Sequence, residues 1–439
     1  MKSNERIRRL CLLALSACFV SVVAQTASAQ QTPAAGTFLI SEFRTSGAGA
    51  QLGDQIRDEY VELYNNTDTM QDLQGYYLQF SDGANDFVIG PLGFSVPVAP
   101  HAHVLFANAP GYTLNGYAAP DFDVASGDTT ADIFTENQGV ALFFGDPVGA
   151  NTRIDAVGFA GNSMTYREGT GLPVFSGGGF TLPGVQYAWA RNLTSGLPQD
   201  TNVNAQDFVL VAPSGALLGG VQSALGAPGP ESSHSPVQQN AQIKSALIDP
   251  QCPASGAATS ACARVRAPNA TGANAALGTL DLRRTFTNKN QQPITALRFR
   301  VVNVTTQGNQ AANEADLRAL DGSDIVLTRA DNMQVTARGL VVETPSAQTN
   351  GGGLNSSLAP TSGLPLASGA SIPVHFLIGV QQGGNYRYFV NVEAASVPQG
   401  NANAVDIEQT SAQPSPIPLK RWLLPRALKL KSSKLRPDN

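Results

Sequence analysis

The chain has 439 residues, including 43 Gly and 28 Pro, and a formal net charge of −5. Only 14% of the residues are charged, and long amphipathic helical patterns are nearly absent, which argues against a helical fold. This composition favours short strands joined by many turns, so we predict an all-β chain of two β-sandwich domains in tandem.

Residues 1–29 have the pattern of an export signal. A basic start, Lys2 to Arg9, precedes an apolar run from Leu10 to Ala24, and small residues end at Ala29. The apolar run is too short for a stable membrane span, so we predict no transmembrane span in the mature chain. Cleavage after Ala29 predicts a secreted or cell-surface protein, and lipidation at Cys18 is the alternative.

Strand patterns dominate residues 37–230. In the run Tyr60-Val61-Glu62-Leu63-Tyr64, the two aliphatic residues share one face and the other three share the opposite face. Tyr60 and Tyr64, with Tyr76, are the candidate binding surface, because Tyr supplies contact area at low entropy cost. The residues predicted to point into the core are Val61, Leu63, Leu78, Leu105, Leu142 and Val157.

Three motifs in this region resemble a known family. They are Ile-Ser-Glu at 40–42, Glu-Tyr-Val-Glu-Leu-Tyr-Asn at 59–65 and Asp-Leu-Gln-Gly-Tyr-Tyr-Leu at 72–78. Their order resembles the lamin tail domain, an immunoglobulin-like β-sandwich found on nuclear lamins and on secreted bacterial proteins. The resemblance covers residues 37–230 and implies a binding or structural scaffold. The loops around 107–135 and 160–187 are long for this family.

A linker is predicted at residues 231–241, because 227–236 is rich in Pro, Gly and Ser. The second sandwich is predicted at 242–410. Its alternation switches phase at Val301-Val302, which predicts a β-bulge. The segments 285–288 and 294–300 resemble an uncharacterised module of secreted bacterial proteins. Cys252 and Cys262 are predicted to form a disulfide, as expected for an exported chain.

Charge is unevenly distributed along the chain. Residues 37–230 contain 5 Arg, no Lys and 19 Asp or Glu, a net of −14, which argues against nucleic-acid binding by this domain. Residues 420–439 have a net charge of +6. The tail 414–439 is predicted to be disordered. The alternatives are contact with an anionic surface, such as a membrane, cell-wall polymer or nucleic acid, or docking on the acidic first domain.

Calcium is the one cofactor that the sequence suggests. Asp82 and Asp86, and Asp121 and Asp123, place hard oxygen ligands in predicted loops. Another partial site is conceivable at positions 101 and 103, where two His two residues apart point the same way on a strand. The simpler interpretation of this pair is an ordinary strand entry after a proline.

No catalytic motif is present. The chain lacks a Gly-x-Ser-x-Gly elbow, a phosphate loop, a dinucleotide fingerprint and a His-Glu-x-x-His zinc motif. We therefore predict a non-enzymatic surface or interaction protein that binds protein or polysaccharide. Two alternatives remain open: an accessory protein of a metal-dependent hydrolase of nuclease or phosphatase type, and a structural envelope component tethered by its basic tail.

Overall fold

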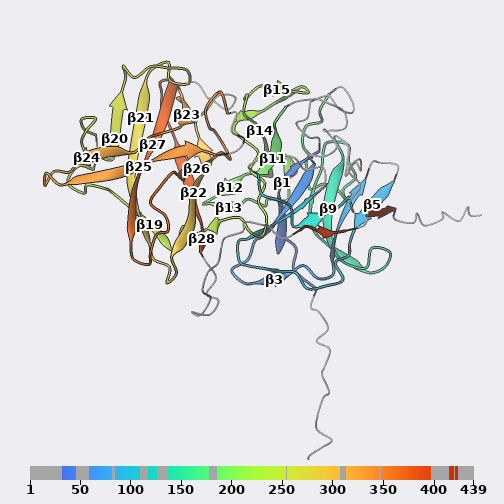
Figure 1. Ribbon diagram of the computed structural model, residues 1–439. Helices are drawn as coiled ribbons and strands as arrows, with labels where there is room; N and C mark the ends of the chain where they lie inside the picture. Colours follow the sequence, from blue (N-terminus) through green and yellow to red (C-terminus); the bar gives the residue numbers. More distant parts are fainter. Residues whose placement is uncertain are drawn as a thin grey trace, which may run out of the picture. The chain divides into compact units, whose positions relative to one another are not determined.

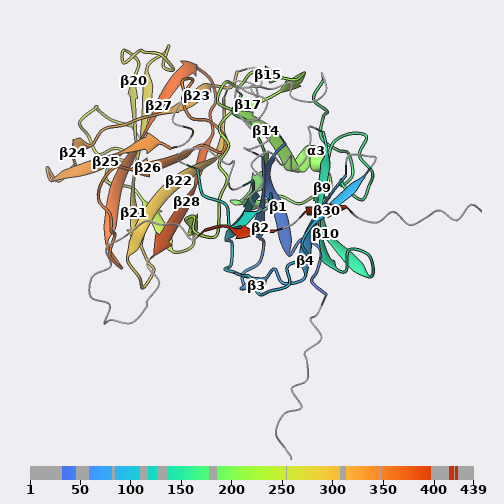
Figure 2. The same ribbon diagram turned by 45° about the vertical axis from the view of Figure 1, so that its right-hand side comes forward.

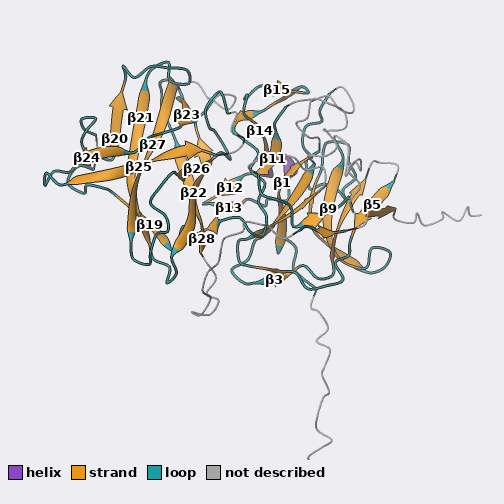
Figure 3. Ribbon diagram, in the orientation of Figure 1, coloured by secondary structure: helices purple, strands orange, loops and turns teal. Residues whose placement is uncertain are grey.

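The described residues of the computed structural model are 32–45, 59–81, 85–108, 117–125, 137–176, 185–253, 255–306, 313–343, 345, 348–396, 415–419 and 421–423. They are almost entirely strands and turns, which confirms the all-β prediction (Figure 3). One single-turn helix, α3 (Asn204–Asp207), lies among them. No helix in these residues is long and apolar enough to cross a membrane. The predicted signal peptide and Cys18 lie outside the described residues.

Two sheets form the first sandwich. In order across the larger sheet, its strands are β17 (Ala224–Leu225), β14 (Phe208–Ala212), β11 (Ala188–Arg191), β1 (Phe38–Arg44), β2 (Tyr60–Asn65), β7 (His103–Ala107), β8 (Phe122–Asp123) and β29 (Ile417–Pro418). The smaller sheet has the order β10 (Asn151–Val157), β9 (Gly139–Gly145), β4 (Tyr76–Ser81), β5 (Asp86–Ile89) and β30 (Arg421–Leu423).

Three short ribbons decorate the first sandwich. They pair β3 (Gln71–Asp72) with β6 (Pro97–Val98), β12 (Leu193–Thr194) with β13 (Leu197–Pro198), and β15 (Leu217–Leu218) with β16 (Val221–Gln222).

The core of the first sandwich lies between its two sheets. Val61 and Leu63 of β2 meet Leu78 of β4 and Leu142 of β9 in one buried cluster, which also contains Val157. All six residues predicted to point inward are buried. Leu105 is nevertheless on the other face of β7, in a separate cluster with Tyr60, because its strand neighbours Val104 and Phe106 fill the main core.

The predicted Tyr surface is wrong. Tyr60, Tyr64 and Tyr76 expose 0%, 3% and 3% of their surface. Tyr76 points into the main core, where its ring lies edge-on to Phe38. Tyr60 and Tyr64 do lie on the outer face of β2, but other parts of the chain cover that face, including Leu354 of the second sandwich.

The second sandwich is one strongly bent sheet. Its strands follow the order β18 (Val237–Gln238), β28 (Tyr388–Ser396), β22 (Ile294–Val304), β26 (Ser357–Pro360), β25 (Gln334–Val342), β27 (Ser371–Gln382), β21 (Thr279–Asn288) and β19 (Ile243–Ala246). To the side, β20 (Arg264–Ala267) pairs with β21, β23 (Asp316–Leu320) with β27, and β24 (Ile325–Thr328) with β25.

Strand β25 makes the corner of this sheet. Its residues 340–342 pair with β26, and Arg338 and Gly339 pair with β27. The two halves of the sheet therefore fold over one core, which holds Phe286, Phe299 and Phe376. Strands β22 and β28 lie next to each other in both views (Figure 1 and Figure 2). Their register shifts between Val301 and Asn303, which confirms the predicted bulge.

The predicted linker is packed rather than free. Glu231 and Ser232 are buried, and Val237 and Gln238 form strand β18 of the second sandwich. The Pro/Gly/Ser-rich composition predicted a linker, and the backbone of this segment passes closely between the two sandwiches. The segment therefore connects the two sandwiches as a packed stretch rather than as an exposed one.

Part of the C-terminal tail is also ordered. Ile417 and Pro418 pair in parallel with β8. Residues 421–423 form β30, which pairs with β5 and lies beside it in Figure 1. The Arg421 guanidinium stacks over the Phe87 ring at 4.8 Å. The prediction of disorder is wrong for these residues, because they satisfy backbone groups at two sheet edges. Docking on the acidic first domain, the alternative, is confirmed for them.

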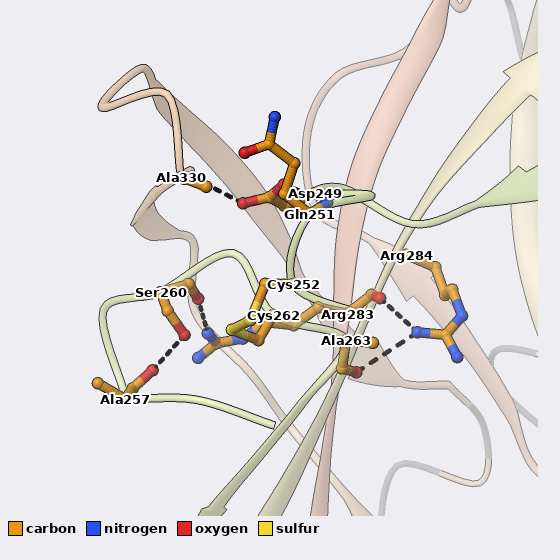
Figure 4. Close-up of a disulfide and its surroundings, with 10 residues drawn as sticks. All are labelled: Asp249, Gln251, Cys252, Ala257, Ser260, Cys262, Ala263, Arg283, Arg284 and Ala330. Carbon is orange, nitrogen blue, oxygen red and sulfur yellow. Dashed lines mark hydrogen bonds between the residues drawn. A yellow bond between two sulfur atoms is a disulfide. The ribbon is translucent and has the colours of Figure 1, made fainter. Parts of the chain in front are cut away.

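The predicted disulfide joins Cys252 and Cys262 (Figure 4). The loop that it closes is tied down a second time by Arg283 of β21. This guanidinium donates to the carbonyl oxygens of Ser260 and Ala258 and pairs with Asp281. The disulfide and the Arg283 hydrogen bonds therefore hold the same loop at two points.

We predict that replacing both cysteines, Cys252→Ser with Cys262→Ser, lowers the free energy of unfolding by about 2–3 kcal/mol, because a loop of this size gains that much chain entropy when open. Urea denaturation of both proteins, with and without reductant, measures the loss. Reductant should destabilise the wild type and leave the double variant unchanged. Equal stability of the oxidised wild type and the variant would contradict the prediction.

Candidate functional site

Charged side chains gather where the first sandwich meets the linker and the second sandwich. We call this group the joint cluster; its members are Glu42, Glu62, His103, Glu231, Arg298, Arg300 and Glu393. None of them is exposed. Four carboxylates, two guanidiniums and one imidazole therefore share a site largely removed from water.

The strand pattern explains how these side chains converge. Glu42 and Glu62 are cross-strand partners on β1 and β2, so two like charges lie opposite each other. Arg298 and Arg300 are two residues apart on β22 and so share one face. Glu393 on β28 is the register partner of Arg298. The acidic face of one sandwich thus meets a basic pair from the other.

Glu42 receives three hydrogen bonds. Its Oε1 accepts from the Tyr60 hydroxyl at 2.5 Å and from the Gly229 backbone N–H at 2.8 Å, and its Oε2 accepts from the Asn355 amide at 2.8 Å. Burial and the neighbouring Glu62 nevertheless raise the pKa of Glu42 to about 7, against these hydrogen bonds and the Arg300 charge. The group therefore titrates near neutral pH.

His103 lies between two glutamates. Its Nδ1 is 2.8 Å from Glu62 Oε1, and its Nε2 is 2.9 Å from Glu231 Oε2. Both nitrogens can donate only when the ring is protonated, so the site either holds an imidazolium or places one proton on a glutamate. Glu62 also accepts from the Ser41 hydroxyl at 2.5 Å. Both ring nitrogens are thus engaged.

The two arginines connect the linker with β28. Arg300 donates from Nε to Glu393 Oε1 at 2.8 Å, and its Nη2 lies 3.0 Å from Glu231 Oε1. Arg298 pairs with the same two glutamates. Burial acts to raise the pKa of Glu393. The charges and hydrogen bonds of Arg300 and Arg298 outweigh it and keep that pKa below its ordinary value. These pairs hold the linker against the second sandwich.

A cavity of about 50 Å³ lies within the joint cluster. Sites for small organic ligands usually measure about 300–1,000 Å³, so this one has room for a few water molecules rather than a substrate. Glu62, His103 and Glu231 offer three potential metal ligands within 4.8 Å of one another. A single ion cannot bind both nitrogens of one ring, and two guanidiniums lie beside it, so the geometry favours hydrogen bonds over a metal centre.

Among the described residues, His101 and His103 belong to no common group of potential metal ligands. His101 lies in the turn before β7 with φ of 58°. Its Nδ1 is 2.8 Å from the Tyr64 hydroxyl and its Nε2 is 2.9 Å from Asp68. The two imidazoles therefore have different partners, although both rings lie near Tyr64.

The residues predicted to bind calcium are not members of the joint cluster. Asp121 accepts hydrogen bonds from the Leu105 and Ser233 backbone N–H groups, and Asp123 accepts from the N–H of Ala125. Asp86 begins β5, and Asp82 lies outside the described residues. Among the described residues, none of the three belongs to a group of potential ligands gathered around one point. The calcium hypothesis therefore gains no geometric support.

A second acidic group contains Asp155, Glu168 and Asp200. Asp155 Oδ2 is 2.6 Å from a guanidinium nitrogen of Arg191 and accepts from the Ile40 N–H at 2.6 Å. Burial, Asp155 and Asp200 raise the pKa of Glu168 to about 8. Arg191 pairs with Asp155, and the pKa of Glu168 lies above neutral pH. We therefore interpret this group as a buried ion pair beside Glu168, a carboxyl that is protonated at neutral pH.

Sequence reasoning missed most of the joint cluster. Arg298 and Arg300 alternate with apolar residues, so both charges lie on one face of the strand. A solvent-exposed strand face would show the same pattern, so the pattern alone does not indicate a buried cluster. Glu231 lies in a segment interpreted as a linker. The available signal was the pairing of opposite charges on two strand faces, but nothing in one sequence indicates which faces meet.

Comparisons with models of protein families, with curated proteins and with solved structures gave no match in any of the three. The resemblance to the lamin tail domain therefore stays a prediction, and the joint cluster has to be interpreted from its own geometry.

We predict that Arg300→Met lowers the free energy of unfolding by about 3–5 kcal/mol, because the change leaves Glu231 and Glu393 buried with one cation fewer. Arg387→Met is the matched control. Arg387 pairs with Glu314 at 2.7 Å but is half exposed, so its loss should cost about 1 kcal/mol or less. Chemical denaturation at neutral pH measures both values, and equal losses would show that the joint cluster contributes little.

Glu42→Gln should make stability less dependent on pH. In the folded protein the pKa of Glu42 is about 7, against an ordinary 4.5. The folded state therefore holds the extra proton between these values, and wild-type stability falls as pH rises through this window. Relative to wild type, the variant should gain about 2–3 kcal/mol between about pH 5 and about pH 8.

Urea denaturation at several pH values tests this expectation, with Asp331→Asn on an exposed turn as the control. A constant difference between Glu42→Gln and wild type across the window would show that Glu42 does not carry the proton.

Proposed function

We propose that this chain is an exported, non-enzymatic scaffold in which two joined sandwiches present their loops to a protein or polysaccharide partner. The observation that carries the proposal is the state of the joint cluster. Its carboxylates and both nitrogens of His103 bond to one another or to backbone across the joint. In this proposal these groups hold the two sandwiches together, because the cavity of about 50 Å³ beside them is too small for an organic substrate.

The lamin-tail-like resemblance supports the same proposal. It implies a scaffold role, and the described residues have the β-sheet architecture that such a role requires. Binding on scaffolds of this kind is done by loops at the ends of the strands. Export is part of the proposal and rests on the pattern of residues 1–29, with the Cys252–Cys262 disulfide as support.

The hydrolase alternative gives the sharpest test of the non-enzymatic part. We expect the purified protein to cleave neither DNA nor bis(p-nitrophenyl) phosphate in the presence of Mg²⁺, Mn²⁺ or Ca²⁺. His103→Gln and His234→Gln serve as a matched pair, because His234 is exposed and lies outside the joint cluster. Turnover that disappears in His103→Gln and persists in His234→Gln would establish an active site at the joint and overturn the proposal.

Binding is tested separately by affinity electrophoresis in gels that contain a neutral glucan or an acidic uronan, and by cross-linking to the host's isolated envelope. Retardation by one polysaccharide, or one reproducible cross-linked protein, is the expected result. Migration unchanged in every gel, with no cross-linked partner, would leave the structural envelope role as the better account.

A further inference from the structure

The second sandwich is open along one side. Strand β25 closes the bent sheet at one corner, whereas β28 and β21 belong to opposite halves and share no pairing among the described strands. At this open side lies a cavity of about 320 Å³, which shares no lining residue with the cavity of the joint cluster, although both border β28. We call it the seam pocket, lined chiefly by Leu282, Arg284, Phe286, Phe376, Tyr388 and Phe389.

The floor and walls of the seam pocket are largely apolar. Phe286 and Phe376 belong to the buried core of the second sandwich, so the cavity reaches into that core. At the surface, Phe389 is 59% exposed and so adds apolar area at the mouth of the cavity. The volume falls in the range of ordinary sites for small organic ligands.

The polar residues that line the seam pocket are Asn240, Ser245, Arg284 and Tyr388. Asn240 is hydrogen-bonded to Asn391 and to the Val392 backbone. Arg284 donates to the backbone oxygens of Arg283 and Ala263, as Figure 4 shows, and has no carboxylate partner among the described residues. Its neighbour Arg283, in contrast, pairs with Asp281. The described residues that line the pocket include no Asp or Glu. The Tyr388 hydroxyl is buried without a hydrogen-bond partner in the described structure.

A second arginine, Arg264, adds to the positive charge near Arg284. Burial lowers the pKa of Arg284, and the positive charge of the neighbouring Arg264 lowers it further. Among the described residues, the Arg264 side chain donates to the Tyr386 hydroxyl alone, at 3.4 Å. Among the described residues, neither Arg264 nor Arg284 pairs with a carboxylate, and Arg284 lines the cavity. A guanidinium binds a carboxylate through two parallel hydrogen bonds.

We propose that the seam pocket binds an apolar carboxylate, with its hydrocarbon body among Phe286, Phe376 and Phe389 and its carboxylate on Arg284. The Tyr388 hydroxyl supplies an additional hydrogen bond inside the cavity. A neutral sugar would leave most of its hydroxyls without partners among these aromatic rings, so a hydrocarbon acid fits the lining better. This site is separate from the protein or polysaccharide binding proposed above and does not depend on it.

Isothermal titration of the full mature chain with decanoate and with decanol tests the proposal, because the two probes share a hydrocarbon body and differ in charge. One decanoate should bind per chain. Arg284→Met should weaken decanoate binding about tenfold or more, the usual effect of losing a charge-assisted hydrogen bond, and should change decanol binding little. Arg266→Met, at an exposed arginine of the neighbouring strand β20, is the control.

A second pair of variants locates the site without relying on charge. Val390→Trp fills the seam pocket and should abolish binding of both probes, whereas Val326→Trp, on the exposed side of β24, should not. Thermal unfolding verifies that each variant is folded. The proposal is overturned if decanoate and decanol bind equally, if neither binds, or if Val390→Trp binds as the wild type does.

Discussion

The arrangement of this protein depends on a compensated repulsion. Glu42 and Glu62 lie opposite each other on adjacent strands, and removing both from water would be costly if they stood alone. The backbone N–H groups of Gly229 and Glu231 donate to Glu42 and Glu62, respectively. The arginines of β22 neutralise the charge that the Glu231 side chain adds. The second sandwich supplies hydrogen-bond donors and positive charge to the buried glutamates, through Asn355 to Glu42 and Arg300 to Glu231. These contacts join the two sandwiches.

This cluster also explains why the outer face of β2 is not a binding surface. On an isolated first sandwich, Tyr60, Glu62 and Tyr64 would form the polar, aromatic face that alternation suggests. In the folded chain the linker and the second sandwich cover that face, and the same residues become interior. The chemistry available for recognition therefore shifts to other places, of which the open side of the second sandwich has the most space.

Strand positions were the part of the fold that could be predicted. The alternation around Val61 and Leu63 gave the correct inward face, and the phase switch at Val301-Val302 gave the bulge, because both depend on local periodicity. The burial of Glu231 and the joining of Arg298 to it could not be predicted in this way. They depend on which surfaces meet, and a single sequence contains no record of that pairing.

The last described strands give the molecule an unusual topology. The chain begins in the first sandwich with β1, builds the second, and then returns so that β29 and β30 each extend one sheet of the first. The second sandwich is thus inserted into the first rather than appended to it. A proteolytic cut near residue 230 would not release two intact halves, since the N-terminal piece would lose an edge strand from both of its sheets.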